Sequence, residues 1–166
     1  SGKLDLVRRK TDVRPLAKHV CDNTQRIDAG ANVTVQLEVP DAPLEANIDA
    51  ERITQVLSNL LSNAVRFAKK SVKVRVWAEG EDLVLEVADD GQGIPENAID
   101  SIFERFSRVE APKSGTGLGL AIVRAIVETH GGSARAENLK TSEGKPAGAR
   151  LTVRVPREVP LPTASS

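Results

Sequence analysis

A carboxylate at the end of an apolar strand is the first feature of this chain that could do chemistry. The sequence Asp89-Asp90-Gly91-Gln92-Gly93-Ile94-Pro95 follows the alternating run 83–88, which predicts a β-strand. Glycines at 91 and 93 let the backbone turn and let a flat ligand approach without meeting a Cβ. An ionised carboxylate only accepts hydrogen bonds, so Asp89 suits a donor such as the exocyclic amine of adenine. The same residues also fit an ordinary Asp-Gly turn.

Two asparagines four residues apart form a second candidate site. Asn59 and Asn63 lie within 49–68, where apolar residues recur at helical spacing and predict a long amphipathic helix. At about 100° per residue, both asparagines and Arg66 project from a polar stripe separate from the apolar face. Amide oxygens suit a Mg²⁺ that already carries phosphates, and Arg66 could face a phosphate. A solvated helix face is the simpler interpretation, but asparagine is unfavourable inside a helix, so two aligned ones favour function.

A glycine-rich segment opens the third candidate site. Gly115-Thr116-Gly117-Leu118-Gly119-Leu120 precedes an apolar helix predicted over 121–129. Glycines at a helix start favour an anion, because free N–H groups and the helix dipole both point at it. The spacing lacks the third interval of the Rossmann fingerprint, and no Gly-Lys-Ser/Thr completes a P-loop. The two common nucleotide-binding motifs therefore do not fit.

Hydrophobic periodicity predicts the elements that must position these residues. Strands are expected at 4–7, 32–39, 44–48, 72–78, 83–88, 133–137 and 149–155. Helices are expected from Thr11 or Asp12 to Gly30, and at 49–68, 96–102 and 121–129. The first helix should bury a stripe that runs from Val13 to Ile27, and the polar segment 138–148 should be a mobile loop. Two strands joined at 80–82 should form an antiparallel hairpin.

Composition restricts the functional class. The 166 residues suit one domain with a sizeable core, and 23 basic residues balance 23 acidic ones. A net charge of zero gives no global field for nucleic acid or membrane lipid, and no run could span a bilayer. One cysteine and two histidines are too few for a Cys/His zinc cluster. The Ser-Gly start and the absence of Met suggest a piece of a longer protein, and we expect a domain over 1–156 with a flexible tail at 157–166.

Taken in order, these motifs resemble the ATP-binding catalytic domain of sensor histidine kinases, within the wider GHKL superfamily. Residues 59–67 resemble the N box, 89–93 the G1 box, 103–106 the F box and 115–119 the G2 box, and the resemblance covers nearly all of 1–156. It implies an α+β fold, a two-layer α/β sandwich of the Bergerat type. About three helices would cover one face of a mixed, mostly antiparallel sheet.

The resemblance also implies a site for ATP between the asparagine helix and the glycine segment. Asp89 would accept from the adenine amine, Asn63 and Asn59 would hold Mg²⁺, and 107–117 would form a lid. Backbone N–H groups of the glycine segment and nearby cations would balance phosphate charge. The expected ATP contacts are Asn59, Asn63, Arg66, Asp89, Gly91, Gly93, Ile94, Phe106, Arg108, Lys113, Gly115, Thr116, Gly117, Leu118, Gly119 and Leu120. Arg66 and Phe67 stand where the family often has Lys and Tyr.

Asn59 separates the branches of the superfamily. Its hydrolysing members usually carry Glu at this position, as a base for water. An amide cannot take that proton, so hydrolysis is disfavoured and the γ-phosphoryl is kept for another nucleophile. Neither His19 nor His130 lies in the family's phosphoacceptor context, and we interpret both as structural.

The resemblance therefore implies partners outside this chain. They are the protein's own dimerisation and phosphoacceptor segment, in a homodimer, and a downstream response regulator. The fragment is expected to be cytoplasmic, without contact to nucleic acid or membrane, and the full-length protein could be membrane-anchored. Two alternatives stay open: a GHKL-type ATPase, and a partner-binding module that uses the nucleotide pocket without kinase activity.

Overall fold

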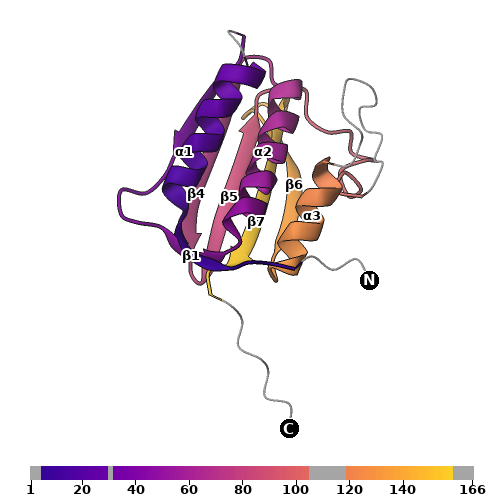
Figure 1. The fold of residues 1–166 in the computed structure, drawn as a ribbon. Helices are drawn as coiled ribbons and strands as arrows, with labels where there is room; N and C mark the ends of the chain where they lie inside the picture. The colour runs from indigo at the N-terminus through magenta and orange to yellow at the C-terminus, as the bar shows by residue number, and fades with distance from the viewer. Residues whose placement is uncertain (1–4, 30–31, 105–118, 159–166) are drawn as a thin grey trace.

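The computed structural model describes residues 5–29, 32–104 and 119–158, which form two layers (Figure 1). The helices are α1 (Val13–Thr24), α2 (Ala50–Phe67) and α3 (Gly119–Thr129), and a π-helical segment, η1 (Gln25–Ala29), extends α1. The strands are β1 (Arg9–Asp12), β2 (Thr34–Glu38), β3 (Glu45–Ile48), β4 (Ser71–Glu79), β5 (Asp82–Asp89), β6 (Ser133–Lys140) and β7 (Pro146–Pro156).

A five-stranded sheet forms one layer, with the strand order β2-β4-β5-β7-β6. β2 pairs with β4 in parallel, and the other neighbouring strands are antiparallel. The three helices lie across one face of this sheet (Figure 1), while β1 and β3 form a separate two-stranded sheet. The predicted α/β sandwich with a mixed, mostly antiparallel sheet is confirmed, as is the hairpin of β4 and β5.

Helix α2 shows how the sequence sets the boundaries of an element. Asp49 is its N-cap, because its Oδ1 accepts a hydrogen bond of 3.1 Å from the backbone N–H of Arg52. The apolar stripe of α2 packs against the sheet, and every member is at most 3% exposed: Ile53, Val56, Leu57, Leu60, Leu61 and Ala64. Burial of this face, rather than helix propensity alone, stabilises the helix. The predicted span of 49–68 is confirmed to within one residue at each end.

Two predictions near the N-terminus are wrong. A strand is expected at 4–7, but the described residues 5–8 form none. The first strand is β1, which is antiparallel to β3, with Arg9 opposite Ile48 and Asp12 opposite Glu45. Asp12, not Thr11, caps α1, because its Oδ1 accepts from the backbone N–H of Arg14 at 3.1 Å. Ile27 is 66% exposed and does not extend the buried stripe. It lies in η1, where the wider turn of a π-helix shifts side chains out of the α-helical phase.

The helix expected at 96–102 is also wrong, since this segment forms successive turns instead. Backbone N–H groups donate only at every third residue, from Ala98 to Pro95, Ser101 to Ala98 and Glu104 to Ser101. The Ser101 hydroxyl also donates to the Ala98 carbonyl at 3.1 Å. Short polar side chains that compete with the backbone in this way disfavour a continuous helix.

The predicted loop at 138–148 is much shorter in the structure. β6 continues to Lys140 and β7 begins at Pro146, with a bulge between Leu139 and Lys140. The turn closes where the N–H of Thr141 donates to the Lys145 carbonyl at 2.8 Å. The polar composition of 138–148 gave no sign of these strand ends. Hairpin pairing satisfies the backbone hydrogen-bonding groups whatever the side chains are. Whether the turn is mobile remains a prediction.

The fold includes Arg157, the first residue of the predicted tail. Its backbone N–H donates to the Glu81 carbonyl and its carbonyl accepts from Asn47, so this residue joins the ends of three strands. Residues 159–166 lie outside the described part, and a tail there remains a prediction.

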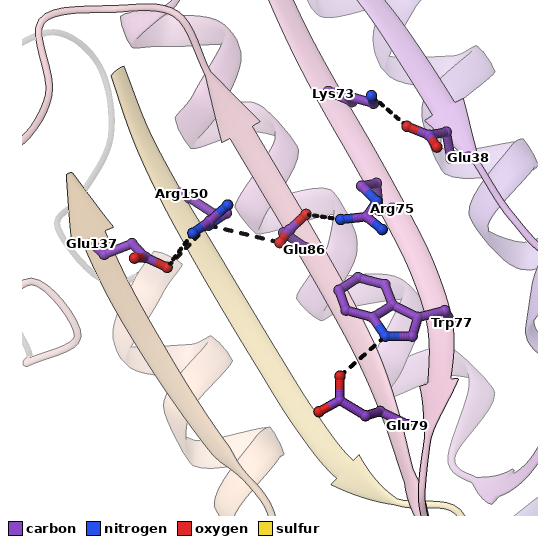
Figure 2. Close-up of polar contacts among 8 residues, drawn as sticks. All are labelled: Glu38, Lys73, Arg75, Trp77, Glu79, Glu86, Glu137 and Arg150. Atoms are coloured by element: carbon purple, nitrogen blue, oxygen red, sulfur yellow. Dashed lines mark hydrogen bonds and ion pairs between the residues drawn. The ribbon is translucent and has the colours of Figure 1, made fainter. Parts of the chain in front are cut away.

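Charged side chains cover the sheet face that the helices leave open (Figure 2). Glu86 of β5 is only 8% exposed and lies between two guanidinium groups, Arg75 at 3.3 Å and Arg150 at 3.7 Å. Arg75 also stacks over the Trp77 ring at 4.6 Å, and Arg150 pairs with Glu137. The network shields the central strand of the sheet from water with paired charges instead of a second helical layer.

We expect Glu86→Gln to lower the free energy of unfolding by about 1 kcal/mol, because it removes the buried anion that Arg75 and Arg150 share. Urea unfolding followed by circular dichroism measures this. The matched control is Lys73→Gln, which breaks the exposed pair with Glu38 and should cost less than about 0.5 kcal/mol. Equal losses in the two variants would contradict the special position of Glu86.

Candidate functional site

Asp89 ends β5 as a buried carboxylate. It is 7% exposed, and its Oδ1 accepts a hydrogen bond of 2.8 Å from the backbone N–H of Gly91. Burial raises the pKa of Asp89, while the N–H groups of Gly91 and Ala149 act in the opposite direction without cancelling the shift. A charge held at such a cost is typical of a functional position, since an incoming donor can compensate it.

The loop after Asp89 passes directly against the end of α2. A Cβ on Gly91 would lie 2.1 Å from the carbonyl oxygen of Phe67, so only glycine fits there. Asp90 fixes the same junction, because its carboxylate accepts from the backbone N–H groups of Lys69 and Lys70 at 2.7 and 3.1 Å. The predicted adenine carboxylate and the asparagine helix are therefore brought together by the backbone itself.

Asn59 connects α2 to the start of α3. Its Nδ2 donates to the carbonyl of Gly119 at 3.1 Å, which places the end of the glycine segment beside the asparagine helix. No described residue donates to the Asn59 or Asn63 amide oxygens, so both remain available to a ligand or a cation. Arg66 is exposed, with its guanidinium carbon 5.4 Å from the centre of the Phe67 ring. Helix α2 thus contacts the loop after Asp89 through Phe67 and the start of α3 through Asn59.

The remaining predicted contacts divide into two groups. Ile94 and Leu120 are half-buried and pack against the core, and Gly93 has a φ of +87° that favours glycine. The following predicted residues lie outside the described ranges, together with the lid at 107–117, and remain predictions: Phe106, Arg108, Lys113, Gly115, Thr116, Gly117 and Leu118.

One residue beside the site was missed from the sequence. Asn138 of β6 hydrogen-bonds the backbone of Ile94 at both its N–H and its carbonyl. A signal was present, because Asn138 follows Ala134 and Ala136 at inward positions of the strand and breaks their apolar alternation.

The described residues hold neither a cluster of acidic, histidine or thiol metal ligands nor a reactive thiol. There, no three His, Cys, Asp or Glu side chains gather to hold a metal ion. Asn59 and Asn63 are neutral oxygen ligands, which fit a magnesium ion only when a phosphate supplies the negative charge. The Cys21 thiol is buried, and burial raises its pKa to about 12, so it is a poor nucleophile.

His130 follows α3 and is fully buried. Its Nε2 accepts from the backbone N–H of Asp49 at 3.1 Å, so the proton resides on Nδ1, which donates to the Ile126 carbonyl at 2.9 Å. The structural role predicted for this histidine is confirmed, and it also joins the last turn of α3 to the start of α2. Asp49 in turn accepts from the backbone N–H of Val7.

Burial lowers the pKa of His130 below its ordinary value of 6.5, with Arg8 acting in the same direction and the Ile126 carbonyl and Asp49 against it. Below that value the unfolded chain takes up a proton that the folded chain excludes, so stability falls as the pH is lowered. We expect the free energy of unfolding to decrease between about pH 7.5 and about pH 5.5, and His130→Gln to flatten this dependence. Urea titrations across the range test it, and an unchanged slope in the variant would contradict it.

Family comparison agrees with this geometry. Residues 48–159 match the family described as histidine kinase-, DNA gyrase B- and HSP90-like ATPase. The chain is 34% identical over 157 residues to the sensor protein KdpD of Clostridium acetobutylicum, across 90% of this chain and 17% of that protein. It is 38% identical over 126 residues to the sensor histidine kinase WalK of Bacillus subtilis, across 71% and 20%. The chain thus spans a fifth or less of these two relatives.

Solved structures share the fold. The nucleotide-free catalytic domain of histidine kinase ThkA has a TM-score of 0.80 and 26% identity, across 92% of this chain and 97% of that one. Full-length ShkA in complex with AMPPNP has a TM-score of 0.83 at 24% identity, across 98% of this chain and 34% of that one, and shows the fold alone. No helix among the described residues is both long and apolar enough to cross a membrane. The chain belongs to the histidine kinase-, DNA gyrase B- and HSP90-like ATPases, as an ATP-binding catalytic domain of the sensor histidine kinase type.

Proposed function

We propose that this chain binds Mg-ATP and donates the γ-phosphoryl to a histidine on a dimerisation and phosphoacceptor segment outside the chain. The observation that carries this is that α2 contacts two other elements: its Phe67 meets Gly91, in the loop after the buried Asp89, and its Asn59 meets Gly119 at the start of α3. The Asp89 carboxylate suits the adenine base, the asparagines of α2 suit a metal ion with its phosphates, and the start of α3 suits an anion.

Each residue has a distinct task in this proposal. Asp89 accepts a hydrogen bond from the adenine amine, and the close approach of Gly91 to Phe67 holds the loop after Asp89 against the end of α2. The amide oxygens of Asn63 and Asn59 hold Mg²⁺ against the phosphates. The backbone N–H groups at the start of α3 would donate to phosphate oxygens, because the helix dipole favours negative charge there. Magnesium, when bound, neutralises charge that develops on the phosphates.

We propose that the acceptor lies in another segment. Transfer breaks the bond between the γ-phosphorus and its bridging oxygen, forms a nitrogen–phosphorus bond on an imidazole and releases ADP and the imidazole proton. His130 cannot serve, because it is fully buried and both ring nitrogens are engaged. The proposed partners are the protein's own dimerisation segment, within a homodimer, and a response regulator that receives the phosphoryl group next. We propose that the domain lies in the cytoplasm and that the full-length protein can carry a membrane anchor.

Asn59 distinguishes kinase from ATPase. It stands where a hydrolytic relative would need a proton acceptor, and its amide instead donates to Gly119. Incubation with γ-labelled ATP and a supplied dimerisation segment tests the proposal. Label on histidine supports the kinase, released phosphate without protein label supports the ATPase, and ATP binding with neither supports a nucleotide-dependent partner module.

A further inference from the structure

Asn138 contacts the loop of the candidate site through both ends of its side-chain amide. The backbone N–H of Ile94 donates to Asn138 Oδ1 at 2.7 Å, and Asn138 Nδ2 donates to the Ile94 carbonyl at 2.8 Å. The side chain therefore pairs with Ile94 as the backbone of a neighbouring strand would, although 44 residues separate them.

The same hairpin end supports the start of the loop. Asn138 pairs with Ala149 across β6 and β7, and the N–H of Ala149 acts on the Asp89 carboxylate. Next to it, Gly148 lies so close to β5 that a Cβ would be 1.8 Å from the Asp89 carbonyl oxygen. The backbone thus fixes one end of the segment 89–94, and a single side chain fixes the other.

Space around this contact is limited. A Cβ on Gly93 would lie 2.8 Å from Asn138 Oδ1, so the amide is packed directly against the glycine turn. Only a side chain that both donates and accepts can satisfy the Ile94 backbone here. Aspartate has the same shape but presents a second acceptor to the carbonyl, and alanine offers neither group.

We propose that Asn138 is a positioning residue for base recognition, since it holds Ile94 and thereby sets the path of the loop 90–94 beside which the adenine ring meets Asp89. This inference rests on the proposed ATP site. Adenine presents an amine donor where guanine presents a carbonyl acceptor, so the position of Asp89 controls selectivity as well as affinity. A residue that only stabilised the fold would leave this selectivity unchanged.

Titration of the whole chain with fluorescent analogues of ATP and GTP tests the inference. We expect Asn138→Asp and Asn138→Ala to weaken ATP binding about tenfold and to reduce the preference for ATP over GTP, through loss of two backbone hydrogen bonds. Arg135→Ala, an exposed change on the same strand, should alter neither quantity. Val153→Ala, a buried change in β7, should lower stability and keep the preference.

The outcomes distinguish failure of the proposed ATP site from failure of the positioning role of Asn138. If the unsubstituted chain binds no ATP, the proposed function fails. If it binds ATP and the Asn138 variants keep its affinity and preference, the positioning role is overturned and the ATP site stands. Should Asn138→Asp not fold, Asn138→Ser, whose shorter side chain has one polar atom in place of two, decides by the same ratio. Faster amide hydrogen exchange at Ile94 in that variant, together with a reduced preference, would support the role, and unchanged exchange and preference would overturn it.

Discussion

Asp89→Asn is expected to weaken ATP binding about 100-fold, because it replaces a buried charged acceptor with a neutral amide. The domain should stay folded. Burial raises the pKa of Asp89 in the folded chain, so its stability contribution is present at low pH and is lost as pH rises through that pKa. At neutral pH the charge is therefore a cost to the fold, and asparagine removes it while it keeps the side-chain shape.

Asp90→Asn is the matched control. This neighbouring carboxylate accepts from the backbone N–H groups of Lys69 and Lys70 and faces the α2–β4 junction. Its replacement should change affinity less than about threefold, since an amide oxygen can still accept one of these bonds. Fluorescent ATP titration in Mg²⁺ and thermal unfolding are measured for both variants. Unchanged affinity in Asp89→Asn, with the fold intact, would remove the base site from the proposal.

Gly148→Ala is expected to lower the free energy of unfolding by more than about 3 kcal/mol, through backbone strain and steric overlap together. Gly148 has a φ of +115°, and a Cβ there would lie 1.8 Å from the Asp89 carbonyl oxygen. Relief of that overlap requires β7 to move away from the end of β5. Because this movement displaces Asp89, ATP affinity should fall as well.

Gly144→Ala separates the two causes. Gly144 lies in the same hairpin with a φ of +85°, and a Cβ there would have nothing within 4 Å. This variant carries the left-handed backbone cost of about 1–2 kcal/mol and no overlap. Chemical denaturation of both variants measures the difference. Equal losses would mean that the approach of β7 to β5 is loose and that the hairpin does not set the position of Asp89.

The sequence predicted most reliably the elements whose local signals agree. In α2, an apolar stripe and the capping Asp49 coincide, and in β5 an alternating run ends at a glycine turn. The segment 96–102 shows the limit, because polar residues there form hydrogen-bonded turns with the same composition as a short surface helix. Ile27 failed for a related reason, since periodicity cannot reveal a π-helical turn that changes the phase.

Contacts across long separations were beyond any local pattern. The approach of Gly91 to Phe67 and the bond from Asn59 to Gly119 follow from packing, and only the resemblance placed these motifs in one site. Asn138 breaks the apolar alternation of its strand, but its partner Ile94 is known only once β6 lies beside the loop. A side chain that supports a site from another strand lies at no fixed sequence distance from that site. A side chain that caps a helix or lines one face of an element recurs at a spacing that the sequence shows.

The single parallel pair, β2 with β4, has a consequence for how the chain folds. The β4–β5 and β6–β7 hairpins join neighbouring segments, so their contacts form after short searches. β2 cannot pair until β3 and the whole of α2 have crossed back over the sheet, which closes a long loop at an entropic cost. β5 and β7 are separated by more of the chain than β2 and β4 are, so loop closure costs more for the β5–β7 pair. We therefore expect the strand that bears Asp89 to pair with β4 first and with β7 last.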